Sequence, residues 1–179
     1  IRDRIKVDPK LEEFRHNIST NPLMKGKKMI VFTESMETAE YLYSQLQSIY
    51  HDRIVYYSGQ SSPALKIEIE DSFNPKFKNK DNNKYDLLIT TDVLAEGINL
   101  HRANVLVNYD LPWNPTRIMQ RVGRINRVGT EHDRIYVFNF FPTAQSKKQM
   151  PLEERILEKL QSFHDTLGED FKYLSDEEE

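Results

Sequence analysis

The stretch from residue 115 to residue 128 reads PTRIMQRVGRINRV, and the interpretation of the whole chain starts from it. The Asn-Pro pair at 114–115 is a typical helix start, because proline is tolerated at the first helical position, where an N–H would have no partner. At about 100° per residue, Ile118, Val122 and Ile125 fall on one face, which we expect to point into a core. The stretch therefore predicts an amphipathic helix that runs to about residue 128.

The side of this helix away from the apolar stripe is strongly basic. A second, polar stripe is formed by Gln120, Arg124 and Arg127. Two further arginines, Arg117 and Arg121, lie along one edge of this stripe. No carboxylate occurs between residues 115 and 130, so the helix cannot neutralise itself internally. Two interpretations are open at this point: a solvated basic face, which charge clusters usually are, or an anion-binding surface, because guanidinium groups match phosphate oxygens.

Five short apolar runs outside this helix predict β-strands. They span residues 29–32, 54–57, 87–90, 105–109 and 135–140. Mainly helical patterns separate them, with Ser35 and Ser62 as candidate N-caps and only one or two helical turns expected within 92–104. Short runs of this kind favour strands buried on both faces, and their alternation with helices favours a parallel α/β sheet. Ligands of such sheets bind at the carboxyl edge of the strands.

Composition excludes several classes of protein. The 179 residues contain no cysteine, which rules out disulfides, cysteine-bound zinc and thiol nucleophiles. No apolar run approaches the roughly 20 residues of a membrane span, and the histidines lack metal-ligand spacing. The net charge of −3 argues against a nucleic-acid partner only superficially, because residues 165–179 hold seven carboxylates and one lysine, while the remainder has 24 basic and 21 acidic residues. The missing cysteines and export signal predict a cytoplasmic protein without a membrane partner.

Several motifs, in a fixed order, resemble those of the second RecA-like lobe of superfamily 2 helicases and translocases. Residues 120–127 (QRVGRINR) resemble the family's Q-x-x-G-R-x-x-R motif, and residues 90–100 (TTDVLAEGINL) resemble the motif before it. Residues 109–115 (YDLPWNP) are similar to the linking stretch of Swi/Snf-type members. Looser early motifs lie at 29–33 and 57–59, with Phe73, so that the resemblance covers roughly residues 25–141.

The resemblance implies an α/β fold, namely a RecA-like three-layer sandwich with a mainly parallel central sheet, plus a C-terminal helix. We expect a helical lead-in over residues 1–24 and the lobe itself over 25–141. Residues 142–179 are expected to hold a loop, an amphipathic helix over 152–167 and an acidic end.

In this family ATP lies between two lobes, and the first lobe supplies the phosphate-binding loop and the acidic motif for Mg²⁺. The sequence G-x-x-x-x-G-K-[ST] does not occur in this chain. We therefore expect a piece of a longer protein, whose first lobe is the partner of this one and which uses ATP and Mg²⁺. The chain alone is expected neither to hydrolyse ATP nor to bind it tightly.

The resemblance assigns roles to individual residues. The arginine fingers at the γ-phosphate are Arg124 and Arg127, and the residues that approach the nucleotide are Gly97, Asn99, Gln120 and Gly123. The nucleic-acid backbone is expected to contact Thr33, Gly59 and Thr91. Plainer roles stay open for several of these positions: the threonines could cap the following segments, and Gly59 and Gly97 could be turn glycines. Trp113 is expected to be a packed aromatic side chain.

Two positions indicate the branch of the family. Gln120 stands where the DEAD-box branch has histidine, and Glu96 replaces the arginine before the motif's glycine. Together with Trp113 they favour the Swi/Snf-type branch, particularly its bacterial members, and DNA over RNA. The chain is thus expected to be the second motor lobe of an ATP-dependent DNA helicase or translocase. The alternatives are the motor of a restriction-type nuclease and a non-catalytic RecA-like module that binds nucleic acid or a partner.

Overall fold

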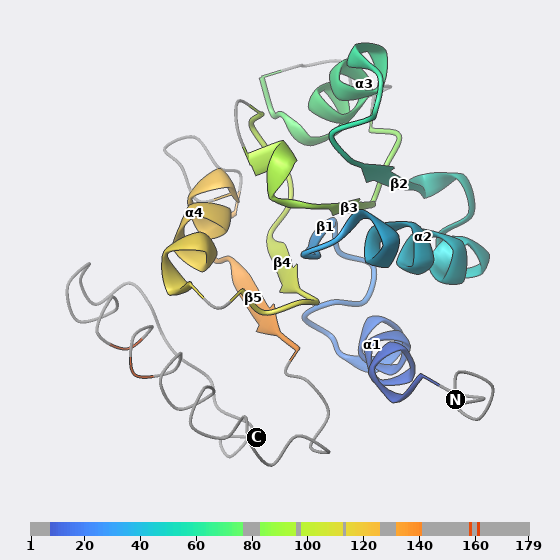
Figure 1. The fold of residues 1–179 in the computed structure, drawn as a ribbon, viewed down its shortest axis with the longest axis vertical. Coiled ribbons are helices and arrows are strands. Elements are labelled where there is room, and N and C mark those ends of the chain that lie inside the picture. Colours follow the sequence, from blue (N-terminus) through green and yellow to red (C-terminus); the bar gives the residue numbers. More distant parts are fainter. Residues whose placement is uncertain are drawn as a thin grey trace.

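A computed structural model describes residues 8–76, 83–95, 98–112, 114–125, 132–140, 158 and 161, and every structural statement below concerns these residues. Helices and strands alternate along the chain (Figure 1). The helices are α1 (Pro9–Thr20), α2 (Met36–Tyr50), α3 (Pro63–Phe73) and α4 (Pro115–Ile125), with short 3₁₀ helices η2 (His51–Arg53) and η4 (Asp92–Ala95). The strands are β1 (Met29–Phe32), β2 (Ile54–Tyr57), β3 (Leu87–Thr90), β4 (Val105–Asn108) and β5 (Tyr136–Asn139).

The five strands form one parallel sheet in the order β2-β3-β1-β4-β5. Every residue of β1, β3 and β4 is buried, as expected for strands covered on both faces. The two edge strands are less buried. The predicted parallel α/β sheet is confirmed, and β4 and β5 are only one and two residues shorter than the expected 105–109 and 135–140.

Helix starts lie where the sequence places them. The Ser35 hydroxyl accepts a hydrogen bond from the Thr38 amide at 3.1 Å, and the Ser62 hydroxyl accepts one from the Leu65 amide at 3.2 Å. Asn114 accepts from the Thr116 amide at 3.0 Å at the start of α4. These side chains satisfy amides that have no partner inside the helix, and so they fix where each helix begins.

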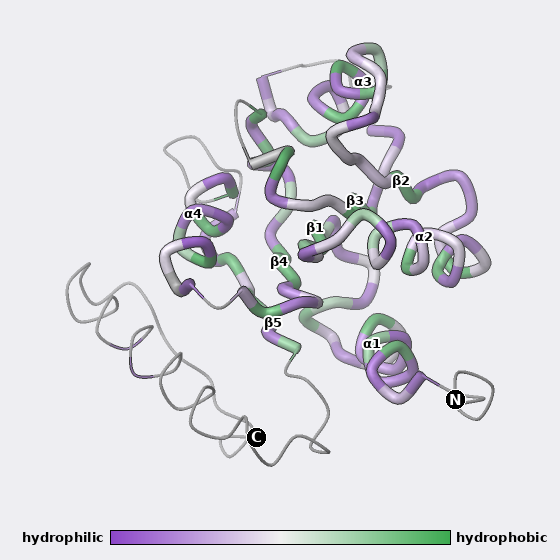
Figure 2. The backbone as a smooth tube through the Cα atoms, viewed as in Figure 1, coloured by the Kyte–Doolittle hydropathy of each residue, from purple (hydrophilic) through white to green (hydrophobic). Residues whose placement is uncertain are grey.

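Two hydrophobic clusters, one on each face of the sheet, complete a three-layer sandwich. On one face, α1 and α2 pack against the sheet through Leu11, Phe14, Ala39, Leu42 and Leu46. On the other face, α3 and α4 contribute Ile69, Phe73, Ile118, Val122 and Ile125. Figure 1 shows α4 and the α1–α2 pair on opposite sides of the strands, and Figure 2 shows hydrophilic and hydrophobic residues alternating along α4.

The connections leave β1 and β4 toward opposite faces. The chain passes from β1 to β2 through α2 on one face, whereas the return to β3 and the steps to β4 and β5 use the other face. Because the chain reverses its direction across the sheet when it moves to the other face, all of the crossovers have the same handedness. The adjacent ends of β1 and β4 therefore form the point where a parallel sheet usually binds its ligand.

Some expectations fall outside the described residues. The helix predicted over 152–167 lies there, and the boundaries at residues 24 and 141 stay predictions. The helix α1 nevertheless shares the core of the sheet through Leu11, Phe14 and Ile18. None of the described helices combines the length and the apolar character that a membrane crossing requires.

Candidate nucleotide and nucleic-acid site

The strand ends form a level edge on which the loops of interest meet. In the register of the sheet, Phe32 at the end of β1 pairs with Thr90 of β3 and Asn108 of β4. Tyr57 at the end of β2 also pairs with Thr90. Because all strands are parallel, the residues that follow them lie along one line, and this line is called the carboxyl edge below.

The three residues expected at the nucleic-acid backbone follow three neighbouring strands. Gly59 comes after β2, Thr91 directly after β3 and Thr33 directly after β1, so the strand order places them in a row along the carboxyl edge. Gly59 is exposed, while Thr91 is only 9% exposed. The sequence thus predicted residues that share one edge of the sheet, although their binding role stays a prediction.

Thr33 is the most enclosed of the three. It has no exposed surface, its amide donates to the Thr90 carbonyl at 2.9 Å, and its hydroxyl donates to the Ser35 carbonyl at 3.0 Å. The cap of α2 is Ser35 rather than Thr33. A contact between Thr33 and nucleic acid therefore requires its hydroxyl to change partner, whereas Gly59 is accessible without any such change.

The helix α4 places its apolar stripe as predicted. Ile118, Val122 and Ile125 are at most 5% exposed and pack on the sheet. On the other side, Gln120 is exposed and Arg124 is half-buried. Both side chains thus keep solvent-accessible surface on the side of α4 away from the core.

A backbone contact joins the end of α4 to the segment that contains Asn99. The Leu100 amide, next to Asn99 in the sequence, donates to the Arg124 carbonyl at 3.4 Å. A Cβ added at Gly123 would meet no described atom within 4 Å, so the close approach inferred for Gly123 has to come from another surface. Gly97, Arg127 and Trp113, which complete the predicted set, lie outside the described residues.

The structure contradicts the prediction for Arg121. The helical pattern places this residue at the edge of the exposed stripe, but its side chain is completely buried. Its Nε and Nη2 donate to the two oxygens of Asp92 at 2.7 and 3.0 Å, and its Nη1 donates to Asn108 Oδ1 at 2.7 Å. Its guanidinium also lies 4.9 Å from the centre of the Phe32 ring. A bidentate pair of this kind is the strongest form of charge-assisted hydrogen bonding.

Asp92 changes the electrostatics of α4. Besides its pair with Arg121, it lies 3.6 Å from Nη1 of Arg117, so one carboxylate serves two of the helix's arginines. No described carboxylate forms an ion pair with Arg124. The basic charge of α4 therefore has two parts: Arg121 and Arg117 are balanced by Asp92, whereas half-buried Arg124 has no ion pair with a described carboxylate.

Sequence reasoning missed Asp92, Asn108 and Arg121 as a connected group. A signal was present, because at about 100° per residue Arg121 lies only about 40° from Ile125, closer to the apolar stripe than to the polar one. The partner Asp92 follows Thr91 directly and so reaches the same edge. An arginine beside a core stripe needs a buried acceptor, which the aspartate after β3 supplies.

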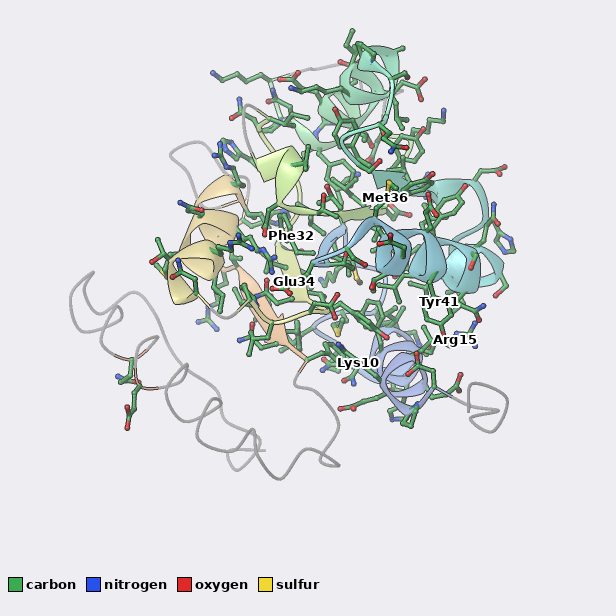
Figure 3. All side chains as sticks on the ribbon, in the orientation of Figure 1. Lys10, Arg15, Phe32, Glu34, Met36 and Tyr41 are labelled. Carbon is green, nitrogen blue, oxygen red and sulfur yellow. The ribbon has the colours of Figure 1, made fainter. Side chains whose placement is uncertain are left out.

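A second polar cluster ties α1 to the carboxyl edge. Lys10 Nζ lies 3.1 Å from Asp110 Oδ1 and 4.2 Å from the centre of the Tyr109 ring. The Glu34 amide donates to Asp110 Oδ2 at 3.2 Å. Figure 3 shows Phe32 and Glu34 at the end of β1, with Lys10 on α1 nearby. Burial is the main cause that raises the pKa of Tyr109 far above its usual value, so this phenol stays neutral.

The described residues fit a phosphate better than a metal ion. Asn99, Gln120 and Arg124 are hydrogen-bond donors, and none of them carries negative charge. Among the residues that the structure describes, no group of three or more His, Asp or Glu side chains could hold a metal ion. This part of the chain therefore does not fit a Mg²⁺ site of its own, but it suits the phosphate end of a nucleotide.

The chain is similar to known helicase sequences. Residues 10–129 match the helicase conserved C-terminal domain family. The chain is 36% identical over 146 residues to the uncharacterized ATP-dependent helicase YqhH of Bacillus subtilis, a match that covers 79% of the chain and 23% of that protein. It is 32% identical over 159 residues to the ATP-dependent RNA helicase SUB2 of Lodderomyces elongisporus, covering 87% and 33%. The chain thus spans about a quarter of the length of the first relative and about a third of the second.

Solved structures share the fold. The C-terminal part of the Fun30 ATPase domain matches with a TM-score of 0.66 and 19% identity, over 88% of this chain and 47% of that one. The C-terminal domain of the DEAD-box protein Dbp5 matches with a TM-score of 0.64 and 23% identity, over 87% and 80%. Both likenesses confirm the RecA-like α/β fold, and the Swi/Snf-type branch stays a prediction. This chain belongs to the helicase conserved C-terminal domain family, as the C-terminal RecA-like lobe of a helicase.

Proposed function

We propose that the chain is the second motor lobe of an ATP-dependent DNA helicase or translocase. It contributes arginine side chains to ATP held by a first lobe of the same polypeptide, and its carboxyl edge contacts the nucleic-acid backbone. The observation that carries the proposal is the position of Arg124. It is half-buried at the end of α4, its carbonyl accepts a hydrogen bond from the Leu100 amide next to Asn99, and it forms no ion pair with a described carboxylate.

The division of charge on α4 gives Arg124 its role. Arg121 is buried against Asp92 and Arg117 lies 3.6 Å from the same carboxylate, so Arg124 is the described arginine of α4 without an ion pair. Charge spreads over the γ-phosphate oxygens during phosphoryl transfer, and an arginine aimed there is typically worth about 10³–10⁵ in rate. Arg127, three residues further along the sequence, is proposed as the second such arginine from the motif alone. ATP and Mg²⁺ would be held by the first lobe.

The row formed by Gly59, Thr91 and Thr33 supports a backbone contact. Backbone amides and hydroxyls at phosphates recognise shape and charge, so the proposal includes no base specificity. DNA is favoured by Trp113 and Gln120, the two positions that resemble Swi/Snf-type proteins. A specific observation favours RNA as the second candidate: a relative that is 32% identical over 159 residues is named an RNA helicase.

The proposal is tested in the full-length protein that contains this lobe. Arg124→Ala is expected to lower DNA-stimulated ATP hydrolysis about 100-fold or more, while the Kd for duplex DNA changes by less than about threefold. Arg134→Ala is the matched control, since Arg134 is an exposed arginine two residues before β5, at the amino end of that strand. Near-normal hydrolysis by the Arg124 variant would remove the finger assignment. Stimulation of the unmodified protein by single-stranded RNA and not by DNA would favour the second candidate.

A further inference from the structure

A pocket of about 410 Å³ lies at the end of the sheet opposite to the carboxyl edge. Three segments line it, and they precede the neighbouring strands β1, β4 and β5. Lys27 belongs to the segment before β1, Asn104 precedes β4 directly, and Tyr136 begins β5. The first and last Cα atoms of a four-residue strand are about 10 Å apart, so the pocket is separate from the proposed nucleic-acid contacts at the carboxyl edge.

The wall before β1 is a tightly hydrogen-bonded turn. The Leu23 amide donates to Asn21 Oδ1 at 2.9 Å, and the Lys27 amide donates to the Met24 carbonyl at 3.1 Å. Met24 has no exposed surface and anchors the turn in the core, while Gly26 has a φ of +68°, a conformation that favours glycine. The backbone of Lys27 is therefore held in place, although its side chain is exposed.

The other walls are formed by the starts of β4 and β5. The Asn104 amide donates to the Lys28 carbonyl at 3.4 Å, and the Tyr136 amide donates to the Asn104 carbonyl at 2.8 Å. His132 Nε2 donates to the Arg102 carbonyl at 2.9 Å, because a carbonyl oxygen can only accept a hydrogen bond. These bonds join the segments to one another, so the pocket is already formed before a ligand binds.

The charge of the pocket is positive. Its charged lining side chains are Lys27, Asp133 and Arg134, and all three are exposed. Neither cation forms an ion pair with a described carboxylate, and two cations against one carboxylate leave a single positive charge in excess. An ammonium and a guanidinium group from two different segments suit a phosphate. One excess charge suits a small anion better than a long polyanionic strand.

Part of the lining is apolar. Pro22, Leu23 and the partly buried ring of Tyr136 contribute to it. Small-molecule sites typically measure about 300–1,000 Å³ and combine apolar and aromatic walls with a few polar groups. A nucleobase stacks on an aromatic ring, and the cations beside that ring suit the attached phosphate. The lining therefore matches a ligand that carries a flat ring and one phosphate group.

We propose that this pocket binds a nucleoside monophosphate, with the phosphate at Lys27 and Arg134 and the base on Tyr136. The ligand is a free nucleotide rather than the phosphorylated end of a strand, because the pocket has only one positive charge in excess. The pocket shares no residue with the proposed ATP and nucleic-acid contacts, so the inference is independent of the proposed function. For the same reason Arg134→Ala stays a control for ATP hydrolysis measured without such a ligand.

The test uses the 179-residue chain, which contains both hydrophobic clusters of the sheet and no G-x-x-x-x-G-K-[ST] sequence to hold a nucleotide. Adenosine 5′-monophosphate is titrated into the ¹⁵N-labelled chain. Amide signals of Lys27 and Tyr136 are expected to shift, with a Kd below about 1 mM. Inorganic phosphate, which lacks the base, is expected to bind at least about tenfold more weakly.

Two variants separate the two parts of the ligand. Lys27→Ala removes a charge-assisted contact and is expected to weaken adenosine monophosphate binding about tenfold. Tyr136→Leu removes the ring but keeps an apolar side chain, so it is expected to weaken adenosine monophosphate about tenfold and inorganic phosphate less than about twofold.

Lys25→Ala is the matched control, because Lys25 is an exposed lysine of the same turn that does not line the pocket. Its Kd is expected to stay within about twofold of normal. Since Lys25 and Lys27 are both exposed, the comparison between their variants holds even if Tyr136→Leu does not fold.

Several results would overturn the proposal. One is the absence of shifts at Lys27 and Tyr136 up to about 5 mM adenosine monophosphate. Another is a set of shifts confined to Thr33, Thr91 and Arg124, which would place the anion at the proposed motor site. Equal losses in Lys27→Ala and Lys25→Ala would indicate general attraction of charge. Tighter binding of a 5′-phosphorylated oligothymidylate would make the ligand a strand end. None of these results depends on ATP hydrolysis, so a failure of the proposed function is recognised separately.

Discussion

Removing Asp92 should destabilise the chain far more than removing Arg117, although both changes break an ion pair with the same carboxylate. In Asp92→Ala, Arg121 stays buried with only Asn108 Oδ1 and the Asp110 carbonyl as acceptors. Breaking a fully buried pair typically costs about 3–5 kcal/mol. Because the Asp92 side chain is 33% exposed, water reaches part of the site, and the cost reduces to about 2–3 kcal/mol.

Arg117→Ala is the matched variant. The Arg117 side chain is 55% exposed and its Nη1 lies 3.6 Å from Asp92, so its removal should cost less than about 0.5 kcal/mol. Urea unfolding of the 179-residue chain measures both free energies. For a chain of this size the Asp92 variant should also melt about 4–12 °C lower. A loss below about 1 kcal/mol in Asp92→Ala, or equal losses in the two variants, would refute the reasoning from burial.

Two further predictions concern pH and helix capping. Burial is the main cause that lowers the pKa of Lys28 from 10.5 to about 8, and its ammonium donates to the Tyr85 carbonyl. Between about pH 8 and pH 10 the unfolded chain then binds more protons, so the free energy of unfolding should rise with pH, and Lys28→Met should abolish that rise. Above about pH 10 the raised pKa values of Tyr50 and Tyr109 act in the opposite direction, because unfolded tyrosines ionise first. Ser35→Ala should cost about 1 kcal/mol in urea unfolding by removing the cap of α2, and Ser35→Asp should retain most of it; equal losses in both would exclude the cap.

Local sequence signals predicted most of the fold. Strand boundaries followed from short apolar runs, and Ser35, Ser62 and Asn114 marked helix starts because a side-chain oxygen next to unpaired amides acts within a few residues. The apolar stripe of α4 was equally local. A local pattern predicts which side of an element faces a core. For the stripe of Ile118, Val122 and Ile125, this prediction agrees with the observed burial.

Partners from distant parts of the chain could not be predicted in this way. The Asp92–Arg121 pair joins residues 29 positions apart, and the Lys10–Asp110 pair joins residues 100 positions apart. A charge count along one helix assigns all arginines to solvent, because the neutralising carboxylate belongs to another element. The enclosed hydroxyl of Thr33 is a similar case, since its burial depends on the packing of the strand ends against α2.

The rate of the chemical step in the full-length protein tests the role of Arg124 most directly. Single-turnover hydrolysis of ATP, with saturating duplex DNA, separates this step from ATP binding and product release. Arg124→Ala should slow it about 10³-fold or more, with the Kd for ATP changed by less than about tenfold. A chemical step within about threefold of normal would contradict the proposal that this lobe supplies the arginine.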